Sequence, residues 1–166
     1  MTSLAKKSLA DLDRLDRQLL DALSRHGRAT HQALGDAIGR SPSAIARRQK
    51  LLEDSGVIAG YQARLDLPGL GLGTLVHIKI ALTSQRKEVM EAFEAAIAES
   101  PSVVRCDLMS GSDDYMITVL ARSLDHFAEI HREELARLPG VARMESGFVL
   151  REVVGTRLPP GLWRDR

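Results

Sequence analysis

The hydrophobic pattern of the chain changes in character near residue 60. Before that point, apolar residues recur every three or four positions, which places them on one face of an α-helix. From residue 74 onward, stretches of apolar and polar alternation, typical of half-buried strands, take turns with helical stretches. We therefore expect two modules, and 166 residues are enough for two small cores.

Three short helices are predicted in the first sixty residues. Five leucines at helical spacing mark the first, over residues 12–25. Thr30 is a suitable N-cap for the second, which stops at Gly39. Ser41 and Pro42 then open the third, because serine caps a helix start and proline suits its first position.

The connection between the second and third helices is short and contains glycine, as a helix-turn-helix requires. The apolar pair at residues 57–58 predicts the strand of a wing. Together these features predict a winged helix-turn-helix over residues 11–60, preceded by a flexible arm at residues 1–10.

The third helix is expected to have one packed face and one exposed face. At about 100° per residue, Ile45, Gln49 and Leu52 share the packed face, where the polar Gln49 is unusual. Side chains that bind phosphates and guanine edges lie on the exposed face or beside it. These candidate DNA-binding residues are Arg40, Ser41, Ser43, Arg47, Arg48 and Lys50. The alternative is a charged face that is merely solvated, and the short connection before this helix favours DNA.

Charge is distributed unevenly, although the net charge is only +1. Residues 1–60 carry 10 Lys and Arg against 7 Asp and Glu, a net charge of +3, and the rest of the chain carries −2. This asymmetry assigns anion binding to the first module.

Composition excludes several classes of protein. No apolar run approaches the roughly 20 residues that span a bilayer, and no signal-peptide core follows Lys6 and Lys7. The single Cys106 rules out an internal disulfide, and the five histidines lack metal-ligand spacing. We expect a cytoplasmic protein without a metal, a cofactor or catalytic residues.

After a turn-rich linker at residues 61–73, the second module alternates strands and helices over residues 74–154, and a tail covers residues 155–166. Its order is β-α-β-β-α-β, which is ferredoxin-like. The expected strands are residues 74–82, 103–109, 115–121 and 141–154, and the helices are residues 86–99 and 124–138. The fold class is therefore α+β, a winged helix-turn-helix followed by a ferredoxin-like βαββαβ domain.

Both helices should cover one face of the sheet and leave the other face bare. The bare face includes Leu75 and Ala81, so it is a candidate association surface. Cys106 is expected as a small buried residue on a strand in the middle of the sheet.

The turn before the third strand is the candidate site for a small molecule. It contains Gly111, Ser112, Asp113, Asp114 and Tyr115. Glycine lets the backbone expose amide N–H groups to a carboxylate, and either aspartate can pair with an ammonium. The alternative is an ordinary β-turn, since Gly, Ser and Asp favour turns.

These motifs, in this order, resemble those of the leucine-responsive/asparagine-regulator (Lrp/AsnC) family. The resemblance extends from residue 11 to residue 158, and Gln49 departs from it, since the family usually has an aliphatic residue there. The similar segments are residues 12–16, 21–23, 27–28, 41–42, 48, 52–53, 56–58, 60–61, 110–111, 114–115, 138–141 and 152–153.

The resemblance implies a transcription regulator whose DNA binding responds to an amino acid. It places the effector at the Gly-x-x-Asp-Tyr turn, at a subunit interface, and implies a homodimer that assembles further, for example into octamers. A dimer with two such helices would bind a palindromic site in double-stranded DNA.

Two alternatives remain at this point. Sirohaem decarboxylases resemble the same architecture, but the basic third helix and the lack of a His-rich pocket count against an enzyme. The other alternative is a sensing module that has lost its ability to bind DNA.

Overall fold

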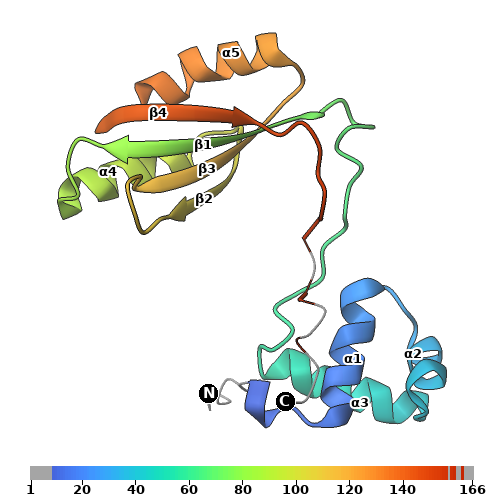
Figure 1. The fold of residues 1–166 in the computed structure, drawn as a ribbon. Coiled ribbons are helices and arrows are strands. Elements are labelled where there is room, and N and C mark those ends of the chain that lie inside the picture. Colours follow the sequence, from blue (N-terminus) through green and yellow to red (C-terminus); the bar gives the residue numbers. More distant parts are fainter. Residues whose placement is uncertain (1–8, 157, 160–161, 163–166) are drawn as a thin grey trace. The chain divides into compact units, whose positions relative to one another are not determined.

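The computed structural model describes residues 9–156, 158, 159 and 162 (Figure 1). The chain divides into two compact units, one formed by Met1–Arg64 with Val154–Arg166 and the other by Leu65–Val153. The arm expected at residues 1–10 and the end of the tail, including Trp163, lie largely outside the described residues. Within the described part, no helix is long and apolar enough to cross a membrane.

Three α-helices form the described core of the first unit, and a side chain caps the start of each. Their bounds are Arg14–Arg25 (α1), His31–Ile38 (α2) and Pro42–Asp54 (α3), after a short 3-10 turn at Leu9–Asp11 (η1). Side-chain oxygens of Asp13, Thr30 and Ser41 accept hydrogen bonds from N–H groups in the first turns. These bonds satisfy donors that a helix start leaves free. α2 and α3 begin at the predicted caps, whereas α1 begins at Arg14, two residues later than predicted, because Asp13 is its N-cap.

The helices enclose a small apolar core of Leu12, Leu19, Leu23, Leu34, Ile45 and Leu52. The strand expected at residues 57–58 is wrong. These residues form a bend after α3, where the N–H of Ile58 donates to the carbonyl oxygen of Leu52 at 3.1 Å and both side chains pack on the core. A strand needs a neighbouring strand for its hydrogen bonds, and the described part of this unit has none.

The second unit has the predicted βαββαβ order. Its elements are β1 (Thr74–Leu82), α4 (Lys87–Ala98), β2 (Val103–Leu108), β3 (Tyr115–Ala121), α5 (Leu124–Glu133), the 3-10 turn η2 (Leu135–Arg137) and β4 (Val141–Phe148). The sheet is antiparallel in the order β2-β3-β1-β4, so β2 and β4 are its edges (Figure 1). This is the ferredoxin-like arrangement that the sequence predicts.

One face of the sheet is packed and the other is open. Val76, Ile78 and Ile80 of β1 are fully buried in the same core as Phe93 of α4 and Phe127 of α5. We call the opposite face the open sheet face. It consists of Leu75, His77, Lys79, Ala81, Met116, Thr118 and Leu120, none of which is buried.

The last strand is shorter than predicted, because β4 ends at Phe148 instead of residue 154. Phe148 pairs with Val76, and the N–H of Val149 donates to the carbonyl oxygen of Leu75 at 2.9 Å. β1 begins at Thr74, so little of it remains for β4 to pair with. The C-terminal end of β4 is therefore determined by where its partner β1 begins, and not by the β-propensity of residues 149–154.

Candidate functional sites: the third helix and the turn before β3

The outward face of α3 carries the residues predicted to bind DNA. Ser43, Arg47 and Lys50 are exposed, whereas Ile45 and Leu52 of the same helix are fully buried. Lys50 Nζ lies 3.2 Å from Asp54 Oδ1, but the lysine side chain is 74% exposed, so this pair is screened by solvent. Arg47 makes no ion pair with any described residue, which leaves its guanidinium available to a ligand.

Two further candidates lie where α3 begins. Ser41 is the N-cap, and its Oγ is 3.2 Å from Ser43 Oγ. Arg40 is exposed, and its Nη1 donates to the carbonyl oxygen of Gly39 at 3.1 Å. These residues lie at the positive end of the helix dipole, where phosphate is favoured.

Arg48 lies differently from the other candidates. Its Nη2 is 2.9 Å from Asp13 Oδ2 and its Nη1 is 3.4 Å from Asp16 Oδ1, both at the start of α1. The Asp16 side chain is only 1% exposed. The Arg48 guanidinium is therefore engaged inside the module.

Gln49 is half-buried and belongs to a hydrogen-bonded trio at the edge of the core. Its Nε2 donates to Tyr61 Oη at 2.8 Å and to Glu53 Oε1 at 3.1 Å, and Tyr61 Oη donates to the same Glu53 oxygen at 2.7 Å. The Tyr61 and Gln49 hydrogen bonds lower the pKa of Glu53. Burial, followed by the Glu53 carboxylate, raises the pKa of Tyr61. The helical period of the sequence indicated that Gln49 is a polar residue on the packed face, but it did not indicate that Tyr61 and Glu53 are its hydrogen-bond partners.

The connection between α2 and α3 is tight at Gly35. Its carbonyl oxygen accepts from the N–H groups of Gly39, at 2.8 Å, and Arg40, at 3.0 Å. A Cβ atom on Gly35 would lie 2.5 Å from the Arg40 carbonyl oxygen. Gly39 has φ of 74°, the left-handed conformation that ends α2. A small residue at position 35 therefore sets the distance between the two helices.

Backbone hydrogen bonds close the turn between β2 and β3 and also join it to β1. The N–H of Met109 donates to the carbonyl oxygen of Asp114, and the N–H of Asp114 donates to that of Ile80, both at 2.8 Å. Gly111 has φ of 132°, and no other residue comes within 4 Å of a Cβ built on it. Gly111 and Ser112 are exposed, so their backbone is open to a ligand.

Both aspartates of the turn are hydrogen-bonded within the chain. Asp114 Oδ2 accepts from the N–H of Leu82 at 2.7 Å, and its Oδ1 accepts from Gln85 Nε2 at 2.6 Å. Asp113 Oδ1 accepts from Arg143 Nη2 at 2.6 Å. The ammonium of a ligand would therefore have to displace Gln85 from Asp114 or Arg143 from Asp113.

Tyr115 faces the core instead of the outer surface of the turn. It is 1% exposed, its ring centroid lies 4.6 Å from that of Phe93, and its Oη donates to Glu94 Oε1 at 2.7 Å. Burial, followed by the hydrogen bond to Glu94, raises its pKa well above the ordinary value.

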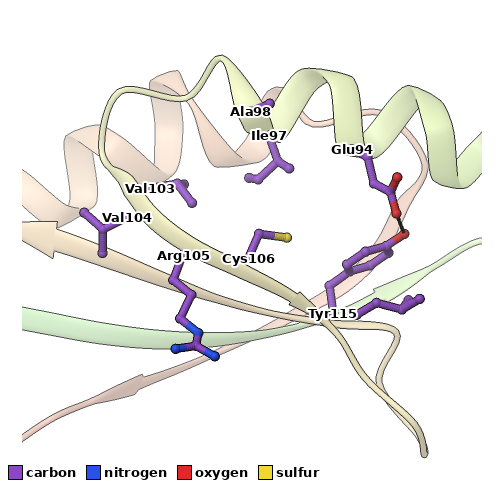
Figure 2. A pocket seen from close by; sticks show the side chains of 9 residues that line it. Glu94, Ile97, Ala98, Val103, Val104, Arg105, Cys106 and Tyr115 are labelled. Atoms are coloured by element: carbon purple, nitrogen blue, oxygen red, sulfur yellow. Dashed lines mark hydrogen bonds between the residues drawn. The ribbon is translucent and has the colours of Figure 1, made fainter. Parts of the chain in front are cut away.

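An open pocket of about 380 Å³ adjoins this pair, between α4 and β2 (Figure 2). It is lined by Glu94, Ile97, Ala98, Val103, Val104, Arg105, Cys106, Leu108 and Tyr115. Cys106 is exposed, so the prediction that it is buried is wrong. Its strand β2 is an edge of the sheet and not the middle. Although the residue is exposed, partial burial of its sulfur, with Asp107 and Glu94 nearby, raises the pKa of the thiol, which is therefore protonated at neutral pH.

Comparison with protein families finds both modules. The model described as the Lrp/AsnC ligand binding domain matches residues 75–159, and the model described as winged helix-turn-helix DNA-binding matches residues 12–59.

Individual relatives agree with the family models. The chain is 33% identical over 153 residues to a leucine-responsive regulatory protein of Salmonella typhimurium, covering 92% of this chain and 93% of the relative. An uncharacterised HTH-type transcriptional regulator of Sinorhizobium fredii is 43% identical over 121 residues, covering 73% and 95%. Among solved structures, a transcriptional regulator of Neisseria meningitidis in complex with L-Met matches with a TM-score of 0.84 and 32% identity, covering 89% and 96%.

The matched regulators extend over both units, and they lend no support to the sirohaem-decarboxylase alternative. Together with the exposed basic face of α3 and the βαββαβ unit, they settle the class of the protein. The chain belongs to the Lrp/AsnC family of transcription regulators, with a helix-turn-helix DNA-binding domain followed by a ligand-binding domain.

Proposed function

We propose that the protein binds palindromic promoter DNA as a homodimer through α3, and that an amino acid at the turn of residues 110–115 changes this binding. The observation that carries the DNA half is the exposed Arg47, which lies opposite the core and has no ion-pair partner among the described residues. Lys50 lies on the same face, and both side chains can contact base edges or phosphates. Arg40, Ser41 and Ser43, around the start of the helix, are assigned to phosphates.

Substitution of the exposed cations tests this assignment. Arg47→Ala and Lys50→Ala should each weaken binding to a selected DNA site by roughly 1–3 kcal/mol if the residue contacts bases, without a loss of thermal stability. Lys87→Ala is a matched control, because Lys87 is an exposed lysine of α4 in the other unit. Wild-type affinity in both α3 variants would remove these residues from the DNA-binding surface.

The effector half rests on the open backbone at Gly111 and Ser112 and on the two aspartates beside it. Backbone N–H groups in such a turn can bind the carboxylate of an amino acid. Its ammonium would bind Asp113 or Asp114 by replacing Arg143 or Gln85, which occupy these carboxylates in the free chain. The L-Met complex of the Neisseria meningitidis regulator supports an amino acid as the ligand class.

A thermal-shift screen of the free amino acids tests the effector half. A ligand that binds only the native state raises the melting temperature, by an amount that grows with its concentration over its dissociation constant. One amino acid, or a few related ones, should shift the melting temperature and change DNA affinity. An equal lack of response to all of them would count against an amino-acid effector.

The same proposal includes the location and assembly of the protein. A promoter-binding regulator acts in the cytoplasm, where the DNA is. We assign the dimer contact to the open sheet face, whose apolar side chains a second copy can cover, and we expect dimers to assemble into larger oligomers such as octamers.

A further inference from the structure

Arg48 of α3 contacts a different element, the start of α1. Arg48 is 26% exposed, and its guanidinium lies 2.9 Å from Asp13 and 3.4 Å from Asp16. The two aspartates also form the capping box of α1: Asp16 N–H donates to Asp13 Oδ1 at 2.8 Å, and Asp13 N–H donates to Asp16 Oδ2 at 3.3 Å. We call these three side chains the α1–α3 clasp.

The clasp differs in kind from the other contacts of α3. Ile45 and Leu52 hold the helix against the core by apolar packing, which has little directionality and tolerates small rotations. The Arg48 guanidinium instead pairs with two carboxylates at ion-pair distance, and this attraction depends on where each carboxylate lies relative to the guanidinium. The capping box holds both carboxylates in place. The site at the start of α1 that the Arg48 guanidinium occupies is therefore fixed as well.

We propose that Arg48 is a positioning residue: it sets the rotation of α3 about its own axis, and so the direction in which Arg47 and Lys50 meet DNA. Arg48 follows Arg47 directly in the helix, so a small rotation that frees Arg48 also moves Arg47. This inference rests on the proposed function of α3 and reassigns one of its residues. DNA specificity then depends on Asp16, a side chain that is 1% exposed and does not reach DNA.

Salt dependence separates positioning from direct binding to DNA. Removing one cation that binds a phosphate lowers the slope of log K against log salt by about 0.9. The DNA probes are a duplex enriched from a random pool by the wild-type protein and a scrambled duplex of the same length. The variants are Arg48→Met and Asp16→Asn, with Arg47→Met as the matched control.

Arg48→Met and Asp16→Asn are both expected to lower the ratio of affinities for the enriched and scrambled duplexes, on the order of tenfold, and to leave the salt slope unchanged. Arg47→Met is expected to lower affinity with a smaller salt slope or with altered discrimination at one base position, and to keep the wild-type melting temperature. Arg48→Lys should restore part of the specificity ratio, since lysine keeps the positive charge but its compact ammonium cannot lie beside both carboxylates as the wider guanidinium does.

A melting temperature lower by roughly 5–10 °C is expected in Arg48→Met, because a buried carboxylate is left without its arginine partner. If that variant is unfolded, the double variant Asp16→Asn/Arg48→Gln replaces it. This variant removes the buried carboxylate together with its arginine partner, so no buried charge is left unpaired and the fold is expected to be kept. Its specificity ratio should also be low.

Three results would overturn the proposal. One is a wild-type specificity ratio in folded Arg48→Met or Asp16→Asn, because the clasp would then be only structural. Another is a smaller salt slope in Arg48→Met with normal specificity in Asp16→Asn, which would mean that Arg48 binds a phosphate directly. The third is no enrichment of any duplex by the wild-type protein, which would refute the proposed DNA binding and this inference with it.

Discussion

Asp113 and Asp114 are neighbours in the chain, but their carboxylates bind different strands. Asp114 bonds to the N–H of Leu82 at the end of β1, and Asp113 bonds to Arg143 of β4. The Leu82 contact is to a backbone donor beside the core, whereas Arg143 is an exposed side chain. At the scale of residues, one aspartate therefore supports the turn and the other is more readily released to a ligand.

Replacing Asp114 should lower stability as well as effector binding. Asp114→Ala leaves the Leu82 N–H without this acceptor and is expected to cost about 1–3 kcal/mol in the free energy of unfolding. Asp113→Ala should cost no more than about 1 kcal/mol, because its arginine partner is exposed. Urea unfolding of both variants checks this order. Equal stabilities would mean that Asp114 does not support the turn.

The hydrogen bonds of Tyr61 and Gln49 to Glu53 predict a pH dependence. They hold the pKa of Glu53 below its ordinary value of 4.5. Folding therefore lowers this pKa, so ionised Glu53 adds stability above the ordinary value that is lost as the pH falls through the lower folded value. Tyr61→Phe removes the largest cause, and its free energy of unfolding should fall less than that of the wild type between about pH 5 and about pH 3.

Denaturant unfolding at a series of pH values measures this difference. Glu53→Gln is the control, because it removes the titrating carboxyl group and Tyr61→Phe should then have no further effect on the pH profile. Identical profiles for the wild type and Tyr61→Phe would contradict the assignment.

The approach of α2 to α3 depends on Gly35 at the scale of elements. A larger side chain there meets the backbone oxygen of Arg40, which cannot move without separating the two helices. Gly35→Val is expected to lower the free energy of unfolding by roughly 1–3 kcal/mol and to weaken DNA binding, because α3 shifts. Gly60→Ala is a suitable control, since nothing lies within 4 Å of its Cβ position. Chemical denaturation of both variants measures the difference, and wild-type stability in Gly35→Val would contradict this role.

The open sheet face matters at the scale of the whole molecule. Leu75 and Leu120 are directly paired in register at one end of it, and the Nδ1 of His77 lies 3.1 Å from Thr118 Oγ1 beside them. Half-buried leucines in register on an uncovered sheet form a surface that a second copy can bury.

A charge in this face should prevent the proposed dimer from forming. Leu120→Lys is expected to convert the protein to monomers at micromolar concentration, because association would bury an unpaired ammonium. Leu124→Lys is the control, since Leu124 is 64% exposed at the start of α5. Light scattering after size exclusion distinguishes the outcomes. A dimer that persists in Leu120→Lys, or a wild-type monomer that binds DNA specifically, would place the interface elsewhere.

The sequence alone determined the helices of the first unit, the βαββαβ order of the second, and the buried and exposed faces of β1 and α3. These features depend on signals close together in the chain: caps such as Thr30 and Ser41, glycine stops such as Gly39, and the period of apolar residues. The family resemblance added the class of protein, since many weak motifs in a fixed order are specific together.

Only the tertiary structure decided which polar residues have partners. Arg48 and Lys50 look alike in the sequence, but Arg48 pairs with buried Asp16 in another helix, and Lys50 pairs with exposed Asp54 in its own helix. The edge position of Cys106, the end of β4 at Phe148 and the bend in place of a strand at residues 57–58 were decided in the same way. Each depends on which distant segment lies alongside, because a charge or a strand needs a partner in space and not a neighbour in the chain.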